Sequence, residues 1–393
     1  MSRMVFVAVI IVGLSSISFG YSGGTGDPNN PYQIAAKADL LALAADINDY
    51  NKCFILTADI SMQGQVFTTA IIAANTISSY LFHGTAFTGT FDGNGHKITD
   101  FTINGGSNSC LGLFGQINPG SSVKNLGLGN CAVSGDNYVG GLVGLNYGSI
   151  SNCYSTGSVS GSGEVGGLVG WNESGTISDC YSTGTVNGGS SGYGGGLVGG
   201  NNGSISNCYS MSTVGGGSNS YELGGLVGLN GGSISNCYST GRVSGGSNSE
   251  DVGGLVGGNF SSVSGGFWDI NTSGQTTSAG GTGETTAQMK TLSTFTTAGW
   301  DFTNETANGT NDYWRMCVDG VNYPQLNWEY AQYGDFACPD GVDFTDFAYF
   351  ADRWHTAGCD SSNNFCGGTD IDSSGTVDIQ DLAIFAANWL SDE

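Results

Sequence analysis

The chain has 393 residues, of which 69 are glycine, and its 33 acidic and 9 basic side chains give a formal net charge of −24. This charge argues against a nucleic acid partner, because binding to phosphates depends on clustered Lys and Arg. Glycine at this density opposes long helices and favours short strands joined by turns. The composition therefore predicts a mainly β, acidic protein.

The first twenty residues have the features of a secretory signal peptide. Arg3 precedes an apolar run over residues 4–14, and the small residues Ser18 and Gly20 occupy positions −3 and −1 of a cleavage site. The run is too short to span a membrane, and an uncleaved anchor is the alternative. We expect residues 1–20 to be removed and the mature chain, without a membrane span, to be secreted or held at the cell surface.

Residues 21–105 are expected to form an N-terminal cap and the first coils of a β array. Within them, Leu40, Leu43, Ala44 and Ile47 have the spacing of one helix face. Such a helix would cover the open end of the array, whose exposed strand edge otherwise invites pairing with other chains.

Residues 106–270 form a tandem repeat. A GLVG tetrapeptide recurs at intervals of 26, 29, 29 and 29 residues, with its leucine at Leu142, Leu168, Leu197, Leu226 and Leu255. A fixed period of this size indicates a solenoid or array. Each repeat is expected to supply short strands that stack on the next at ~4.8 Å. The period predicts a right-handed parallel β-helix of ~29-residue coils, and a β-propeller with blades of ~40 residues is the alternative.

The side chains of the repeat are expected to form ladders. We expect Leu, Val, Ile and Cys to point inward, and glycine to allow corners with positive φ. Asn152, Asn207 and Asn236, with Asp179, are expected to form a hydrogen-bonded ladder at a turn. An acidic group precedes several GLVG copies, at Asp136, Glu164, Glu222, Glu250 and Asp251. These carboxylates are either a row of calcium ligands or, more simply, solvated charges at loop tips.

The sequence of residues 224–245, GGLVGLNGGSISNCYSTGRVSG, resembles the GLUG repeat of secreted bacterial proteins. The resemblance implies a pectin-lyase-like β-helix in an extracellular or cell-surface protein. It implies no known catalytic residues.

Residues 271–330 differ from the repeats because they are rich in aromatic residues. They include Trp300, Trp314, Tyr323 and Trp328. We expect this segment to cap the C-terminal end of the array. The alternative is that exposed aromatic rings form a platform for sugars.

Residues 335–393 are expected to form a second, acidic domain with a twelve-residue calcium loop of the EF-hand type. Side-chain oxygen ligands stand at positions 1, 3, 5, 9 and 12 of this loop, which are Asp370, Asp372, Ser374, Asp378 and Asp381. Thr376 at position 7 would contribute its backbone carbonyl. Calcium takes six to eight such oxygens, and Gly375 at position 6 allows the sharp turn. A weaker second loop departs from this pattern and contains Asp335, Asp340, Asp343 and Asp346.

Each loop is followed by an apolar helix face, and the two faces lie 35 residues apart. They contain Phe347, Phe350 and Trp354, and then Leu382, Phe385 and Trp389. Two loop–helix units of this kind resemble a type I dockerin. The resemblance implies a small all-α, calcium-binding module that docks onto a cohesin. A calcium-stiffened module without a cohesin partner is the alternative.

The eleven cysteines are an odd number for an exported chain, so at least one lacks an intramolecular partner. The repeat cysteines are expected to be stacked, buried thiols. Cys359 and Cys366 bracket a short polar loop and are the candidate disulfide. Zinc is not expected, because no CxxC pair or histidine cluster accompanies them.

No catalytic residue is predicted, because the coils hold only Lys124 and Arg242 as cations and no Ser-His-Asp motif is evident. We therefore expect a secreted, non-catalytic GLUG β-helix that serves as a surface, adhesive or polysaccharide-contacting scaffold. Residues 335–393 would attach it to a cohesin-like or cell-surface protein. The alternative is a polysaccharide-degrading component, a glycoside hydrolase or lyase, of a dockerin–cohesin assembly.

Overall fold

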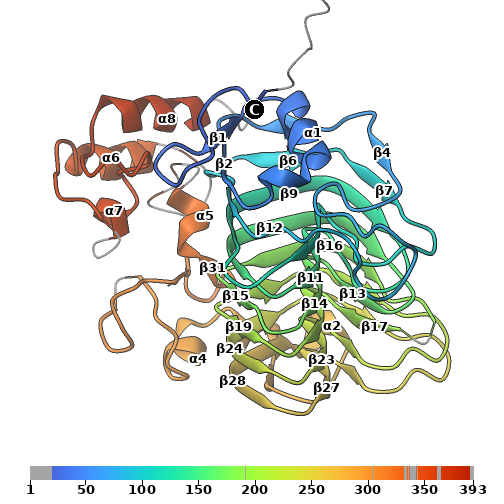
Figure 1. Ribbon diagram of the computed structural model, residues 1–393. Helices are drawn as coiled ribbons and strands as arrows, with labels where there is room; N and C mark the ends of the chain where they lie inside the picture. Colours follow the sequence, from blue (N-terminus) through green and yellow to red (C-terminus); the bar gives the residue numbers. More distant parts are fainter. Residues whose placement is uncertain are drawn as a thin grey trace, which may run out of the picture.

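The computed structural model describes residues 20–190, 192–303, 305–331, 334, 336, 342, 344–360 and 364–389. The expected signal peptide lies outside the described residues except for Gly20. The described chain is a mainly β parallel solenoid of about six coils of about 29 residues, followed by an aromatic segment and small helices (Figure 1).

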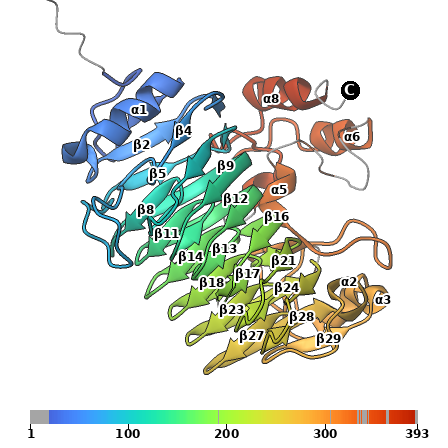
Figure 2. The same ribbon diagram turned by 90° about the vertical axis from the view of Figure 1, so that its right-hand side faces the viewer.

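The N-terminal region closes one end of the solenoid. It comprises β1 (Tyr32–Ile34), α1 (Lys37–Ala45), the 3-10 turn η1 (Ile47–Asp49) and β2 (Cys53–Leu56). Helix α1 lies over the first strands, and its Leu40 and Leu43 are fully buried (Figure 2). The predicted covering helix is present, although it ends at Ala45.

The coils contribute to three parallel sheets. Besides β1 and β2, the largest contains β3 (Ile60–Ser61), β4 (Val66–Phe67), β5 (Thr90–Asp92), β6 (Lys97–Thr99), β7 (Thr102–Asn104), β9 (Ser122–Ser134), β12 (Ser149–Ser160), β15 (Thr176–Ser178), β16 (Tyr181–Asn187), β19 (Ser204–Ser206), β20 (Tyr209–Ser210), β21 (Thr213–Gly215), β24 (Ser233–Ser239), β25 (Val243–Ser244), β28 (Ser262–Asp269) and β29 (Thr282–Glu284). The five-stranded sheet contains β10 (Val139–Gly140), β13 (Glu164–Gly166), β17 (Tyr193–Gly195), β22 (Leu223–Gly224) and β26 (Val252–Gly253). The six-stranded sheet contains β8 (Phe114–Ile117), β11 (Val143–Asn146), β14 (Val169–Asn172), β18 (Val198–Asn201), β23 (Val227–Asn230) and β27 (Val256–Asn259).

The register places equivalent residues of successive coils on top of one another. Ile150 pairs with Ile177, which pairs with Ile205, and Ile205 pairs with Ile234. These isoleucines and the leucines of all five GLVG copies are at most 1% exposed. The predicted inward ladders of Leu, Val, Ile and Cys are therefore confirmed, and they form one continuous core.

Gly184, Gly189 and Gly265 adopt positive φ as expected of glycine in the repeat, but the glycines of GLVG have a different role. One corner of the coils has positive φ at Asn125, Asn152, Asp179, Asn207 and Asn236, whereas the GLVG glycines do not adopt positive φ. A Cβ at Gly170 would lie 2.5 Å from backbone atoms of Tyr138 and Val139 in the preceding coil. Glycine is therefore required where the five- and six-stranded sheets approach closely.

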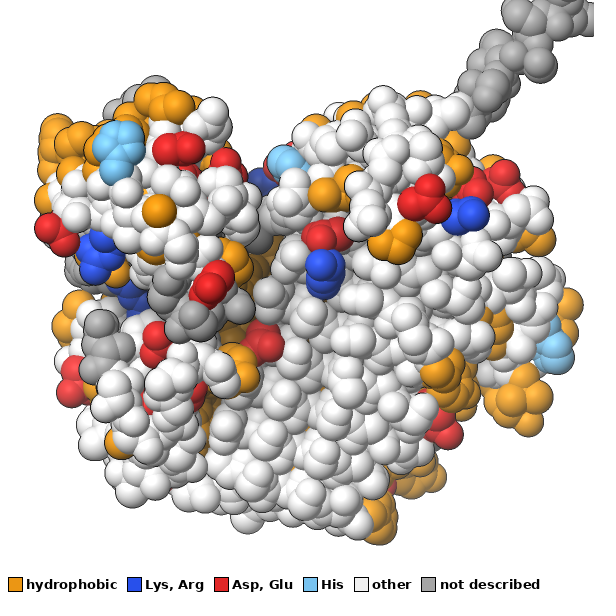
Figure 3. Space-filling model, turned by 60° about the vertical axis from the view of Figure 1, so that its left-hand side comes forward, with side chains coloured by type: hydrophobic (Ala, Val, Ile, Leu, Met, Phe, Trp, Pro, Cys, Tyr) orange, Lys and Arg blue, Asp and Glu red, His pale blue; other side chains and the backbone are white. Residues whose placement is uncertain are grey.

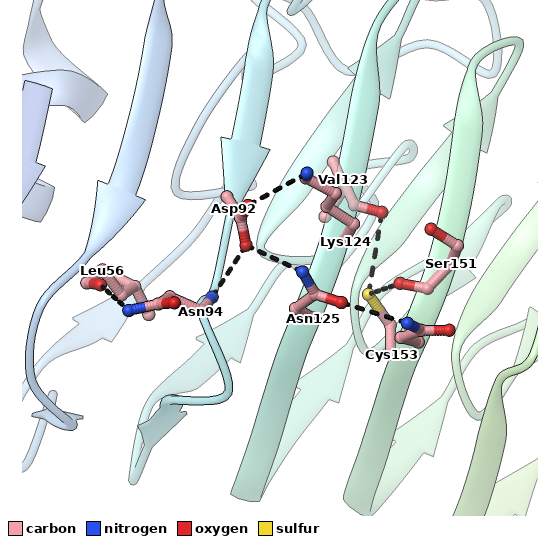
Figure 4. A network of polar contacts seen from close by, with 9 residues as sticks. Leu56, Asp92, Asn94, Val123, Lys124, Asn125, Ser151 and Cys153 are labelled. Carbon is pink, nitrogen blue, oxygen red and sulfur yellow. Dashed lines mark hydrogen bonds and ion pairs between the residues drawn. The ribbon is translucent and has the colours of Figure 1, made fainter. Parts of the chain in front are cut away.

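The continuous asparagine ladder also lies elsewhere than predicted. The Nδ2 of each residue donates to the Oδ1 of the next at 2.7–2.8 Å, in the order Asn146, Asn172, Asn201, Asn230 and Asn259. The corner that we predicted is linked in pieces, as Asn152 donates to Asn125 at 3.1 Å and Asn207 donates to Asp179 at 3.2 Å. Asp92 extends the first piece by accepting from Asn125 (Figure 4).

The repeat cysteines are buried free thiols, as expected for this column of the core. The thiol of Cys180 donates to the carbonyl of Ser178 at 3.0 Å and accepts from the backbone amide of Cys153 at 3.4 Å. Cys208 repeats both contacts one coil later. Burial raises the pKa of Cys180 and Cys208 well above the usual range of a thiol.

After the last coil come α2 (Ile270–Ser273), α3 (Thr286–Met289), α4 (Leu292–Thr296), the antiparallel pair β30 (Trp314–Arg315) and β31 (Gln325–Leu326), and α5 (Asn327–Ala331). Most of this segment covers a lateral face of the coils, where the sequence predicted a cap over their C-terminal end. Beneath it, Tyr154, Tyr181, Tyr209 and Tyr238 stack with ring centroids 4.9–5.1 Å apart.

This lateral contact has an aromatic core, and polar links tie it to the coils. Trp300 and Trp314 are fully buried against the tyrosines, so these two rings cannot form an exposed sugar platform. Tyr209 donates to the carboxylate of Glu329 at 2.9 Å, and the indole of Trp328 donates to the carbonyl of Asp179 at 2.9 Å. The tyrosine column thus explains why the aromatic segment packs against the side of the coils, because rings stacked along the coils leave an apolar stripe that must be covered.

The aromatic segment runs back along the solenoid, and the remaining helices follow it. These are α6 (Phe344–Asp352), α7 (Asn364–Gly367) and α8 (Ile379–Trp389). Figures 1 and 2 both place α6 and α8 beside the N-terminal coils, away from the last coil. Their core contains Phe336, Phe350 and Phe385.

Candidate functional site

The predicted calcium loop brings three carboxylates together immediately before and within the first turn of α8. Oxygens of Asp370, Asp372 and Asp381 lie within 4.8 Å of one another. It is the one such convergent group of His, Cys, Asp or Glu side chains among the described residues. Asp370 and Asp381 are buried and Asp372 is exposed, so the group opens to solvent on one side.

Backbone amides of the loop hold these carboxylates in place. Asp370 accepts from the amides of Ser374 at 3.0 Å and Gly375 at 2.9 Å. Asp381 accepts from Asp372 at 3.1 Å and from Asp378 at 2.8 Å, which ties the helix start back to the loop. The tight turn has φ of +93° at Gly375, a conformation that suits glycine.

The donor set fits calcium chemically. Burial raises the pKa of Asp370, and the nearby Asp381 and Asp372 carboxylates add to this effect. Close, desolvated carboxylates repel one another until a cation or protons neutralise them. Hard oxygen ligands of this kind are those that calcium takes. Thr376 and Asp378 follow in the same loop, at the positions expected of a carbonyl ligand and a further carboxylate.

The weaker second loop falls mostly outside the described residues. Asp335, Asp340 and Asp343 belong to that part of the chain, and the structure says nothing of them. Asp346 is described, lies in the first turn of α6 and is 2% exposed.

A disulfide joins Cys359 to Cys366, with Cα atoms 5.0 Å apart. Both cysteines pack in the small core formed with Phe336, Phe350 and Phe385. The bridge closes the connection between α6 and α7, ahead of the carboxylate loop.

An exposed apolar groove of about 360 Å³ lies between α6 and α8. We call it the α6–α8 groove, and it is lined by Phe344, Phe347, Leu382, Phe385, Ala386 and Trp389. Phe344 is 79% exposed and its ring lies 5.0 Å from that of Trp389. Ile379, at the start of α8, is 60% exposed. Large apolar side chains exposed together in this way mark an interaction surface.

The flank carboxylates do not converge as a metal site would require. Glu164 pairs in register with Tyr193 of the next coil, and Glu222 lies one coil further on. Tyr193 therefore stands between the two glutamates in the column. Burial raises the pKa of both glutamates, and nearby acidic groups, Asp136 beside Glu164 and Asp251 beside Glu222, add to it.

Comparison with known proteins identifies the repeat. Residues 135–160, 161–187 and 219–244 match the GLUG motif. Three coils of the solenoid are therefore GLUG repeats. Halomucin of Haloquadratum walsbyi is 35% identical over 138 residues, which are 35% of this chain and 2% of halomucin. A Gly-rich membrane protein assigned in Evansella cellulosilytica is 29% identical over 146 residues, 34% of this chain and 15% of that protein. The chain thus spans a small part of each relative.

The structural matches are more distant. A protein of Bacteroides ovatus assigned as an immunoglobulin A1 protease has a TM-score of 0.45 at 18% identity, over 78% of this chain and 95% of that one. An IgA1 protease has a TM-score of 0.41 at 17% identity, over 60% of this chain and 19% of that one. At this distance neither match supports an argument about function.

Two features of the surface escaped the sequence analysis. The tyrosine of the Cys-Tyr pair stacks into a docking stripe, and its strict recurrence beside cysteine was the available signal. Trp171 replaces a small or aliphatic residue that other copies of the repeat have at this position. None of the helices in the described residues has the length and apolar character needed to cross a membrane.

Proposed function

We propose that this chain is a secreted, non-catalytic GLUG scaffold, attached to a cohesin-like or cell-surface protein through a dockerin-like, calcium-binding C-terminal module. One observation carries the proposal: the loop that gathers Asp370, Asp372 and Asp381 leads directly into α8, which is one wall of the exposed α6–α8 groove. Ion binding and partner docking are thereby coupled through a single helix.

Calcium is the cofactor in this proposal, and its contribution is to neutralise the loop carboxylates. The residues that would hold it are Asp370, Asp372, Ser374, Thr376, Asp378 and Asp381. Asp381 already fixes the first turn of α8 by accepting two backbone hydrogen bonds. With its charge balanced, that carboxylate would hold α8 against α6 and keep the groove in shape.

The surface of the solenoid supports a scaffold role. On the largest sheet, Ser151 pairs with Ser178, Ser178 with Ser206 and Ser206 with Ser235, which gives a column of hydroxyls on the outer side. Figure 3 shows a broad coil face on which few charged or large apolar side chains are visible. The names of the relatives, halomucin and a membrane protein, support placement at a cell surface.

Calcium titration of the full secreted chain by calorimetry tests the metal site. We expect Asp370→Asn and Asp381→Asn each to weaken calcium binding at least tenfold. Asp352→Asn is the matched control, since this aspartate is exposed on α6 and forms an ion pair with its neighbour Arg353. A parent chain that takes up no calcium would remove the basis for the module.

A second experiment tests docking. Purified cohesin domains are titrated with the chain in calcium and then in a chelator. We expect calcium-dependent binding that Phe347→Ala abolishes and Phe260→Ala leaves intact, because Phe260 is 80% exposed but lies on the solenoid. Equal binding by both variants would show that the α6–α8 groove is not the docking surface.

A further inference from the structure

One flank of the solenoid gathers aromatic rings and carboxylates in a column that follows the five-stranded sheet. At the start of each strand, or one residue before it, successive coils place Tyr138, Glu164, Tyr193, Glu222 and Asp251. The side chains of the first four are half-buried, as is the neighbouring Trp171. We call this surface the aromatic–carboxylate flank.

The indole of Trp171 packs against Gly200 in the next coil. A Cβ at Gly200, its partner in register, would lie 2.2 Å from the indole carbons, so only glycine leaves room for the ring. The indole N–H donates to Glu173, which also accepts from Asn202 at 3.1 Å. The ring of Tyr138 lies 6.0 Å away at 57°. These contacts hold the Trp171 ring in a fixed orientation beside a second aromatic ring.

The carboxylate of Glu222 occupies a similar space two coils further on. A Cβ at Gly258 would lie 2.5 Å from the Cγ of Glu222 and 3.2 Å from a methyl group of Leu229. The Glu222 Oε2 is buried and has no hydrogen-bond partner among the described residues. A buried acceptor without a donor is costly, so the Glu222 carboxylate would gain stability if it turned outward to accept from a ligand hydroxyl.

The charge of this flank restricts its ligand. Between Tyr138 and Asp251 the sequence has one basic residue, Arg242, against several carboxylates, so an acidic polymer would meet a mainly negative flank. The negative face of an aromatic ring attracts polarised C–H groups, which a pyranose ring presents on its flat sides. The sugar hydroxyls can donate to carboxylates. Rings and acceptors that repeat along the coils suit a polymer of such sugars.

We propose that the aromatic–carboxylate flank binds an uncharged polysaccharide, with Trp171 as the stacking ring and Glu164 and Glu222 as acceptors for sugar hydroxyls. The proposal deepens the scaffold function proposed above by naming what the solenoid contacts. It does not depend on calcium, so it can fail or stand separately from the C-terminal module.

The test is affinity electrophoresis of the full secreted chain in native gels that contain a soluble neutral β-glucan, a neutral xylan, a neutral mannan or polygalacturonate. We expect at least one neutral polymer to retard the parent chain, in calcium and in chelator alike, and polygalacturonate to leave it unaffected. Trp171→Ala should weaken retardation at least tenfold, and Glu222→Gln at least threefold. Phe260→Ala, which removes an exposed ring of the same solenoid, is the matched control and should change nothing.

Two results would overturn the proposal: no retardation by any of the neutral polymers, or equal retardation of the parent and Trp171→Ala chains. Tyr138→Ala is a second test of the same surface, should Trp171→Ala fail to fold as judged by circular dichroism. Retardation that disappears in chelator would also overturn it, since binding would then belong to the calcium module. If the parent chain released new reducing ends from a polymer and Glu222→Gln did not, the flank would be a hydrolytic site and the binding proposal would be overturned.

Discussion

Replacing one asparagine of the buried ladder tests whether these amides hold the coils together. Asn201 is 1% exposed, accepts from Asn172 at 2.7 Å and donates to Asn230 at 2.8 Å. Asn201→Ala removes both bonds, so the side-chain N–H of Asn172 loses its acceptor and the side-chain oxygen of Asn230 loses its donor. Each keeps one weaker contact, to the carbonyl of Gly175 at 3.2 Å and the amide of Gly232 at 3.3 Å.

The expected loss of stability follows from these two groups. A buried polar group that loses its partner costs about 1–3 kcal/mol, so the pair predicts a loss of about 2–4 kcal/mol after the remaining contacts are counted. The adjacent Asn202 is exposed, and its side-chain amide donates to the carboxylate of Glu173 at 3.1 Å. Asn202→Ala is therefore the matched control, with an expected change within about 0.5 kcal/mol.

Urea unfolding followed by tryptophan fluorescence measures the difference. The comparison uses the unfolding midpoint and requires that the dependence on urea is the same in all chains. If Asn201→Ala is no less stable than Asn202→Ala, the ladder does not stabilise the solenoid, and the shape of the coils must rest on the apolar core alone.

Three further predictions concern other buried groups. Burial raises the pKa of Glu329 from 4.5 to about 7, so the folded state holds this proton more tightly than the unfolded state. The free energy of unfolding should therefore fall by up to about 3 kcal/mol as pH rises from 4.5 to 7. Glu329→Gln should flatten this pH dependence in unfolding experiments, and an unchanged dependence would show that other groups cause it. Trp314→Ala should destabilise the aromatic segment by about 3–5 kcal/mol because the indole is fully buried. Limited proteolysis would detect this loss as faster cleavage of the segment, and cleavage at the rate of the parent chain would contradict the packing of Trp314. The Cys208 thiol should resist a thiol reagent in the native chain and react at once in urea, and native-state reaction at the rate of an exposed thiol would contradict the buried cysteine column.

Much of the solenoid follows from the sequence because its period is explicit. The nearly constant spacing of GLVG determines the coil length, and the apolar positions of each repeat determine which residues point inward. The two asparagine positions recur with the same period, so periodicity could not tell Asn201 from Asn207. Only the geometry of the corner places Asn201 inside and Asn207 at a turn with positive φ.

The path of the aromatic segment could not be predicted in the same way. Composition identified Trp300 and Trp314 as a covering element, yet a cap over the end and a strip along the side bury similar apolar area. The choice depends on the stacked tyrosines, which become a continuous stripe only when the coils are assembled. For the C-terminal loop, by contrast, ligand spacing alone identified the residues that converge, Asp370, Asp372 and Asp381.

The return path of the aromatic segment gives the solenoid a direction. Because α6 and α8 lie beside the N-terminal coils, a partner bound in the α6–α8 groove would hold the molecule near that end (Figure 2). The last coil, with the exposed ring of Phe260 beside it, would then form the free tip. Each coil lengthens the reach of this tip by roughly 5 Å, the spacing of adjacent strands. The number of repeats thereby becomes a measure of how far the protein extends from its tether.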